Sequence, residues 1–319
     1  MWPGKAGPTP LWPRLGAYGV DLFFVISGWL IGGLFWREAA RFGEVEVRRF
    51  IVRRVLRTMP PYFVALALYS VAAGMFSAPP PILNWHYLCF VQNYGVVIPS
   101  FVVSWSLCVE EHFYLFFPLA TAALLASGTG RAFRFAALLS LAPLAGRLCF
   151  MGESEGFFGY YWTASHLRAE GLILGVWASY LFVNEPLLWT RLQAVCRLAA
   201  WPLILGAAAL LLYLPPWGYS VGVFLLSWGF MMLVVNAVSS PASKAASTRV
   251  NYLIAITSYS TYLVHPLAIH VAKALHPQGG LPLALLMLLG VAAASGVFFF
   301  AVEVPSLRLR DALAPRRCD

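Results

Sequence analysis

Long apolar runs separated by short polar stretches are the main pattern along this chain. A membrane helix needs about 20 predominantly apolar residues, and windows of that kind recur throughout the sequence. The pattern predicts nine spans, at 18–36, 59–77, 105–126, 133–150, 167–183, 200–214, 220–238, 252–272 and 281–303. We therefore expect an all-α fold, a polytopic membrane helix bundle, with 1–319 as a single domain and 1–15 as an irregular start.

The segment 82–98 is also apolar, but Asn84, His86, Gln92 and Asn93 interrupt it. Polar groups without partners are costly in the hydrocarbon core of a bilayer. We expect this segment to be an interfacial or re-entrant piece and not a tenth span.

The composition excludes several classes of protein. Hydrophobic residues make up 60% of the chain and charged residues 11%, whereas soluble domains carry about 25% charged residues. A soluble globular protein and a disordered chain are therefore excluded. The net charge is +9, but the basic residues punctuate apolar runs and form no single face for nucleic acid. The five cysteines show no close pairing, so we expect neither a metal site nor a disulfide framework.

Basic residues concentrate in alternate loops, as short cytoplasmic loops do. They follow the first span at 37–57 and recur at 131–134, 191–197, 244–249 and 308–317, whereas 78–104 has no Lys or Arg. This pattern predicts a cytoplasmic C-terminus and, with nine spans, a start outside. The start carries no signal peptide, so the parity favours one further helix upstream.

Ionisable residues inside membrane spans mark functional sites or structural pairs. Glu110 and Glu111, followed by His112, lie in the third predicted span. The predicted topology places five further groups at a similar outer depth: Asp21, His166, Arg168, Glu170 and His265. Each has a structural alternative, such as a helix cap for Asp21 or neutralisation of a nearby carboxylate by Arg168. Their shared depth predicts a polar cavity that opens outward.

Arginines also line one face of the amphipathic segment 48–57. Such a stripe suits anionic lipid headgroups. It suits a phosphorylated cytoplasmic ligand equally well, because arginine pairs bidentately with phosphate. Both interpretations remain open at this point.

Six segments of the chain resemble the acyltransferase 3 family of integral-membrane acyltransferases, which includes O-antigen acetylase-like enzymes. They follow the family's order and span nearly the whole chain: 19–28 (GVDLFFVISG), 53–62 (RRVLRTMPPY), 105–115 (WSLCVEEHFYL), 166–171 (HLRAEG), 259–266 (YSTYLVHP) and 302–305 (VEVP). The resemblance implies ten membrane helices in a bacterial inner membrane. It also implies transfer of an acyl group, usually acetyl from cytoplasmic acetyl-CoA, to a hydroxyl of a carbohydrate or similar acceptor, with no permanently bound cofactor.

The chain departs from the family's pattern in its first helix. The family places an arginine there and, eleven positions on, an essential histidine. Here Arg14 is followed eleven positions on by Val25, and the first histidine in the chain is His86. We therefore expect weak or no activity from this chain, in agreement with the missing helix. Two milder changes are His112 in place of glutamine and Glu170 in place of aspartate.

The resemblance assigns roles to the polar residues. The phosphates of acyl-CoA are expected to bind Arg53, Arg54 and Arg57. Glu110, Glu111 and His265 are the expected catalytic residues, with Glu110 or His265 replacing the absent base that takes the acceptor's proton. The expected substrate-binding residues are Asp21, Ser27, Trp105, His166, Arg168 and Glu170.

Two other classes of function remain open. A transporter or flippase would use the same polar cavity as a path for a lipid or proton. A catalytically dead homologue, or a chain with a misassigned start, would keep the fold without turnover. The identity of the acceptor, the acyl length and the oligomeric state are not encoded in any pattern of the sequence.

Overall fold

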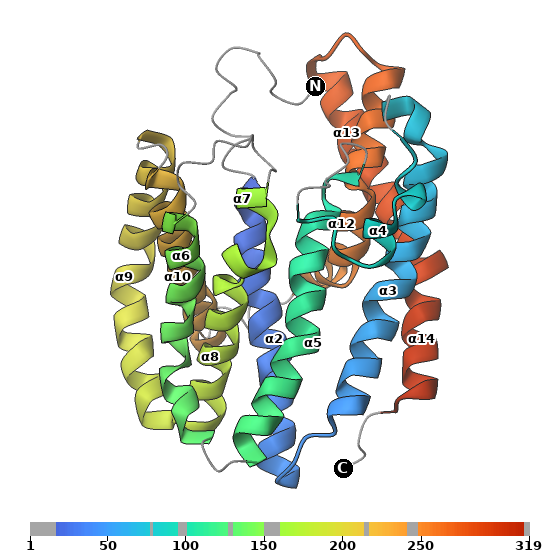
Figure 1. Cartoon of the computed structure of the whole chain (residues 1–319). Coiled ribbons are helices and arrows are strands. Elements are labelled where there is room, and N and C mark those ends of the chain that lie inside the picture. Colours follow the sequence, from blue (N-terminus) through green and yellow to red (C-terminus); the bar gives the residue numbers. More distant parts are fainter. Residues whose placement is uncertain are drawn as a thin grey trace. The chain divides into compact units, whose positions relative to one another are not determined.

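The computed structural model describes residues 17–76, 79–94, 101–126, 130–149, 160–213, 217–240 and 248–315, and every regular element in these ranges is helical (Figure 1). The predicted irregular start at 1–15 lies outside the described residues. The long helices are α2 (Gly19–Phe42), α3 (Val47–Val71), α5 (Ser104–Ala126), α8 (Glu170–Asn184), α9 (Pro186–Tyr213), α10 (Trp217–Ser239), α12 (Arg249–Leu275), α13 (Gly280–Phe298) and α14 (Val304–Leu313). The all-α prediction is therefore confirmed.

Shorter helical pieces connect these helices. They are η1 (Ala73–Phe76), η2 (Pro81–Leu83), α4 (Trp85–Leu88), η4 (Gly130–Ser140), α6 (Leu141–Cys149), α7 (Tyr160–Thr163), η5 (Ser165–Leu167) and the π-helical turn η6 (Phe299–Glu303). In the described part of 82–98, the four residues of α4 are too few to cross a bilayer. The predicted span 133–150 is a 3₁₀ segment followed by the short helix α6.

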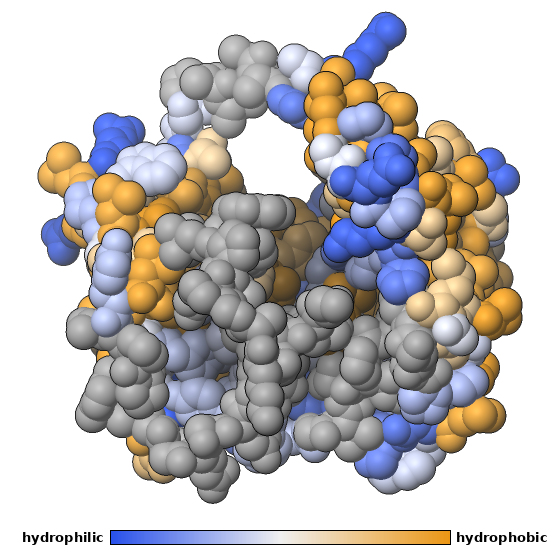
Figure 2. Space-filling model, turned by 90° about the horizontal axis from the view of Figure 1, so that it is seen from above, coloured by the Kyte–Doolittle hydropathy of each residue, from blue (hydrophilic) through white to orange (hydrophobic). Residues whose placement is uncertain are grey.

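Five helical segments of the described chain are long and apolar enough to cross a membrane. They are Gly19–Phe42, Ser104–Ala126, Pro186–Tyr213, Gly218–Ser239 and Gly280–Leu313. The other predicted spans are also helical, but α3 and α12 carry more polar residues, and Glu170–Asn184 is shorter. Much of the visible surface of the described residues is hydrophobic, as expected of a protein embedded in lipid (Figure 2).

The chain forms two compact units. Unit 1 comprises 1–45 and 119–243, and unit 2 comprises 46–118 and 244–319. The prediction that 1–319 form a single domain stays a prediction.

Glycines allow α2 and α8 of unit 1 to pack closely. A Cβ atom added to Gly28 would lie 2.2 Å from the carbonyl oxygen of Leu172, and one added to Gly175 would lie 2.2 Å from that of Val25. The Trp36 indole N–H donates a hydrogen bond of 3.3 Å to the Val176 carbonyl across the same contact. Small residues at helix crossings are typical of membrane bundles, where close packing drives association.

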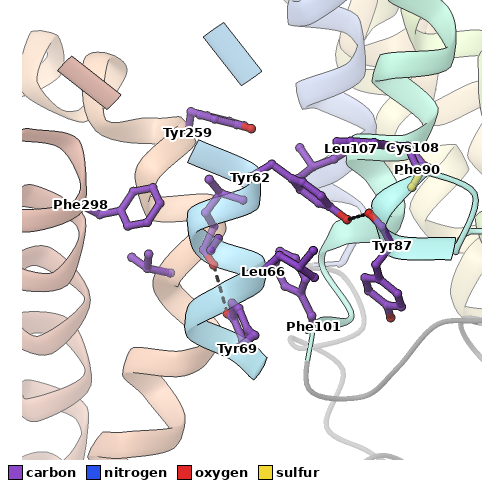
Figure 3. Close-up of a cluster of buried hydrophobic side chains, with 13 residues drawn as sticks. Tyr62, Leu66, Tyr69, Tyr87, Phe90, Phe101, Leu107, Cys108, Tyr259 and Phe298 are labelled. Carbon is purple, nitrogen blue, oxygen red and sulfur yellow. Dashed lines mark hydrogen bonds between the residues drawn. The ribbon is translucent and has the colours of Figure 1, made fainter. Parts of the chain in front are cut away.

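An aromatic core holds unit 2 together (Figure 3). Tyr69 and Phe101 stack with ring centroids 4.4 Å apart. The Tyr62 hydroxyl donates a 2.8 Å hydrogen bond to the Tyr87 carbonyl, and the Tyr69 hydroxyl donates one of 3.1 Å to the Leu263 carbonyl. These bonds satisfy buried hydroxyls and join α3 to α4 and α12.

Candidate functional site

Unit 1 contains a buried ion pair between the first and fifth spans predicted for the chain. Arg168 approaches Asp21 to 2.8 Å, and both side chains are almost completely buried. Arg168 also donates a 2.9 Å hydrogen bond to the Tyr219 hydroxyl, and its guanidinium lies 5.1 Å from the Trp162 ring centroid. The prediction that Arg168 neutralises a nearby carboxylate is confirmed.

A second buried ion pair joins Arg147 of α6 to Glu170 of α8. The closest approach is 2.8 Å, and neither side chain is exposed. Arg147 also donates to the carbonyl oxygens of Leu167 and, at 3.3 Å, Ser220. Arg147 was not among the site residues predicted from the sequence. The signal was an arginine well inside the apolar run 133–150, because charged residues within a membrane span are usually functional or paired.

Together the two ion pairs balance their charges inside unit 1. Buried charges are tolerated only when they are paired and hydrogen-bonded. Asp21 Oδ2 and Glu170 Oε2 nevertheless have no hydrogen-bond partner among the described residues. Each of these oxygens can still accept a hydrogen bond.

Of the other predicted substrate-binding residues, Ser27 and His166 belong to unit 1 and Trp105 to unit 2. His166 is exposed, and its Nε2 lies 3.4 Å from the Tyr160 hydroxyl. Partial desolvation by the surrounding protein lowers the pKa of His166 below its usual value. Ser27 is half-buried in α2, and Trp105 is buried in unit 2.

Unit 2 contains a cavity of about 170 Å³ between α3, α5 and the turn after α4. Polar and charged groups from two helices meet there, namely Arg54 of α3 with Glu111, His112 and Tyr114 of α5. The rest of the lining is Ile51, Val55, Met59, Cys89, Phe90 and Leu115. The cavity therefore combines a cation, a carboxylate and an imidazole within mostly apolar walls.

Glu110 reaches the same group of residues through Tyr114. The Tyr114 hydroxyl donates a 2.6 Å hydrogen bond to Glu110 Oε2, and the Arg54 guanidinium lies 5.6 Å from the Tyr114 ring centroid. The adjacent glutamates thus differ in role, because neighbours on a helix point about 100° apart. Glu111 lines the cavity, whereas Glu110 is buried and bonded to Tyr114.

The three arginines predicted to bind CoA do not act as one cluster. Arg53 approaches Asp311 of α14 to 3.0 Å and donates to the Ala314 carbonyl. Arg54 lines the cavity, and Arg57 is exposed. The predicted topology separated the glutamates, near the outer surface, from the arginines at the cytoplasmic face. That separation is wrong for Arg54 and Glu111, because α3 and α5 overlap along their lengths and both residues line one cavity.

His265 makes its hydrogen bonds within its own helix. Its Nδ1 lies 3.1 Å from the Thr261 carbonyl oxygen and 3.0 Å from that of Tyr262. Tyr262 in turn donates a 2.8 Å hydrogen bond to the Val103 carbonyl, just before α5. The catalytic role predicted for His265 stays a prediction. His112, which follows the glutamate pair but was not among the predicted catalytic residues, lines the cavity.

Val25 lies eleven positions after Arg14. It is fully buried in α2, against α8. Among the described residues, no group of three His, Cys, Asp or Glu side chains is placed to hold a metal ion. Four described cysteines are free, namely Cys89, Cys108, Cys149 and Cys196, and Cys318 lies outside the described residues.

The apolar helices and the buried charges between them define a helical membrane protein with charged residues in its interior. The family model of the acyltransferase domain, acyltransferase 3, matches residues 2–304, and the chain belongs to this family. It is similar to O-acetyltransferase OatA of Staphylococcus aureus strain NCTC 8325 / PS 47, with 27% identity over 300 residues. It is equally similar, at 27% over 304 residues, to SACOL0978 of strain COL, a provisionally named O-acetyltransferase.

These alignments cover 85% of this chain and 49% of each relative. The chain thus spans about half the length of the curated relatives that it matches. No solved structure matches it.

Proposed function

We propose that this chain transfers an acyl group, acetyl in the first instance, from acyl-CoA to a hydroxyl of a carbohydrate or similar acceptor. Membership of the acyltransferase 3 family supports the acyl transfer. The relatives are named O-acetyltransferases, which supports a hydroxyl as the acceptor group. The observation that carries the proposal is the cavity that brings Arg54, Glu111 and His112 together.

The size of this cavity suits the acyl end of the donor. Pockets that hold whole drug-sized ligands measure about 300–1,000 Å³, and this cavity measures about 170 Å³. It has room for a thioester and a short acyl group but not for the nucleotide of CoA. We assign the phosphates to the exposed side chains of α3, foremost Arg57, and the acyl carbonyl to Arg54. Arg53 would join the phosphate site only by exchanging its contact with Asp311.

The chemistry needs a base and a positive charge at this point. Glu111 or His112 takes the proton of the acceptor hydroxyl as its oxygen attacks the thioester carbonyl carbon, a contribution of about 10² to 10⁴ in rate. The Arg54 guanidinium stabilises the oxyanion that forms. The C–S bond then breaks, the acyl group stays on the acceptor oxygen, and the CoA sulfur takes up the proton. Glu110 positions Tyr114 beside Arg54.

We assign acceptor recognition to the polar residues of unit 1, with Asp21 and Glu170 as hydrogen-bond acceptors and Arg168 and Arg147 as the cations that hold them. Asp21 Oδ2 and Glu170 Oε2, which have no hydrogen-bond partner among the described residues, support this assignment. We also place the C-terminus on the cytoplasmic side of the inner membrane, an orientation supported by the basic residues of alternate loops.

The test follows transfer by the full chain in lipid nanodiscs, supplied with acetyl-CoA labelled in the acetyl group and with p-nitrophenyl glucoside as the probe acceptor. Released CoA thiol and label on the acceptor are measured together, and CoA binding is measured separately. Glu111→Gln and His112→Gln remove the candidate bases, while Glu44→Gln and His276→Gln make the same changes away from the cavity.

We expect turnover to fall about 10²-fold or more in at least one cavity variant, with CoA binding retained and both control variants at the wild-type rate. Wild-type turnover in both cavity variants would contradict the assignment of the site. A wild-type chain that neither binds CoA nor releases its thiol would contradict the proposed function itself.

A further inference from the structure

Unit 1 contains a cavity that the proposed reaction does not use. It lies among η4, α8, α9 and α10 and has a volume of about 540 Å³, within the range of established ligand pockets. Its walls are mostly aliphatic and aromatic, and they include Trp177 and Trp228. Two guanidinium groups, those of Arg134 and Arg191, also line it. The cavity is therefore amphipathic.

The charges at this cavity leave one cation uncompensated. Arg134 forms an ion pair of 3.1 Å with Glu185. Arg191, in contrast, makes no hydrogen bond or ion pair with any described residue. A ligand with a single negative charge would complement it, and a phosphate diester has that charge and the oxygens that arginine binds.

A hydrogen-bond donor at the same cavity also lacks a partner. The Trp177 indole N–H donates 2.9 Å to the Arg134 carbonyl, which fixes that ring in the wall. The indole nitrogen of Trp228 is buried and has no hydrogen-bond partner among the described residues. The two indole rings therefore form aromatic walls of the cavity.

The cavity opens onto a hydrophobic surface. Phe135 and Val195 line it and are 64% and 54% exposed, respectively. The exposed apolar surface continues along α9 through Leu198 and Trp201. In a membrane protein such a surface faces lipid tails, so an amphiphile can enter the cavity sideways from the bilayer.

We propose that this cavity binds one anionic phospholipid, with an acyl chain between the aromatic and aliphatic walls and its phosphate on Arg191. The lipid would brace α9 and α10 against α8. This inference is independent of the proposed acyl transfer.

The test counts lipids that remain on the protein by native mass spectrometry, after extraction from nanodiscs of equal parts phosphatidylglycerol and phosphatidylcholine. Val195→Trp fills the cavity from an exposed position, and Arg191→Gln removes the unpaired cation. Leu198→Trp and Arg197→Gln are the matched controls, because these exposed α9 residues do not line the cavity.

We expect one retained phosphatidylglycerol on the wild-type chain and at least fivefold less on Val195→Trp. Arg191→Gln should lose the preference for phosphatidylglycerol over phosphatidylcholine, and both controls should keep it. Equal retention of the two lipids by the wild-type chain, or wild-type retention by Val195→Trp, would overturn the proposal. Displacement of the lipid by acetyl-CoA or by inorganic phosphate would also overturn it, because the cavity would then serve a soluble phosphate ligand.

Discussion

Asp21 and Arg168 are 147 positions apart in the sequence, yet their side chains meet at 2.8 Å in the interior of unit 1. The pair ties the start of α2 to the segment just before α8, beside the glycine-mediated contact of the same two helices. Removing one member of such a pair leaves a buried charge without compensation. Asp21 and Arg168 therefore contribute to the stability of unit 1 and also make its interior polar.

Asp21→Asn should destabilise the protein by about 3–5 kcal/mol, the usual cost of breaking a buried ion pair. Arg168 would keep its bond to Tyr219 but lose its counter-ion. Thermal unfolding in one detergent, compared with the wild-type chain, measures the change.

Glu185→Gln is the control for this prediction, since it breaks the partly exposed pair with Arg134. An exposed pair contributes about 0–1 kcal/mol, so this variant should unfold close to the wild-type temperature. If the two variants lowered the unfolding temperature equally, burial would not determine the strength of the Asp21–Arg168 pair.

Gly175→Ala should separate α2 from α8. The new methyl group would lie 2.2 Å from the Val25 carbonyl oxygen, and a backbone atom cannot move aside without shifting its helix. We expect the free energy of unfolding to fall by about 1–3 kcal/mol, the usual cost of overpacking. Thermal unfolding and the yield of monodisperse protein measure the change.

Gly206→Ala makes the same change in α9, where nothing lies within 4 Å of the added atom. Because alanine favours a helix over glycine by about 0.5–1 kcal/mol, this control should be neutral or slightly more stable. A matching loss in Gly206→Ala would indicate that the α2–α8 contact is not the cause.

The apolar pattern predicted helices correctly because hydrophobic runs of this length have few other stable forms in a bilayer. It did not predict that the arginine segment and the second span form one continuous helix, since Pro60 and Pro61 interrupt the pattern without ending α3. It also missed that the predicted span 133–150 begins as a 3₁₀ segment.

The candidate site was predictable only in part. Asp21, Arg168, Glu110 and Glu111 were predicted because they are charged residues within apolar runs. The partners of these residues depend on which helices pack together and at which depth, and one sequence does not contain that information. This is why Arg147 was overlooked and why Arg54 was grouped with Arg53 and Arg57 as a binding site for the phosphates of acyl-CoA.

Tyr62→Phe should destabilise unit 2 more than Tyr69→Phe does. The Tyr62 hydroxyl joins two groups, because it donates to the Tyr87 carbonyl and accepts a 3.1 Å hydrogen bond from Gln92. The Tyr69 hydroxyl donates to the Leu263 carbonyl. Each buried group left without a partner costs about 1–3 kcal/mol. Unfolding of the two variants under the same conditions measures the difference, and a larger loss in Tyr69→Phe would contradict this ranking.

Arg53 and Arg54 are neighbours in sequence, but the structure predicts opposite effects when each is replaced by glutamine. Arg54 lines the cavity of unit 2, so Arg54→Gln should lower CoA release by about 10²-fold or more, the cost of removing an oxyanion-stabilising group, with little change in unfolding temperature. Arg53 holds α14 through Asp311 and the Ala314 carbonyl, so Arg53→Gln should lower stability by about 1 kcal/mol and leave turnover per folded molecule near the wild-type value. Both variants remove one positive charge from α3 and therefore control for each other. If the two variants lost turnover equally, Arg53 and Arg54 would serve one phosphate site. The assignment of Arg53 to the contact with α14 and of Arg54 to the cavity would then be wrong.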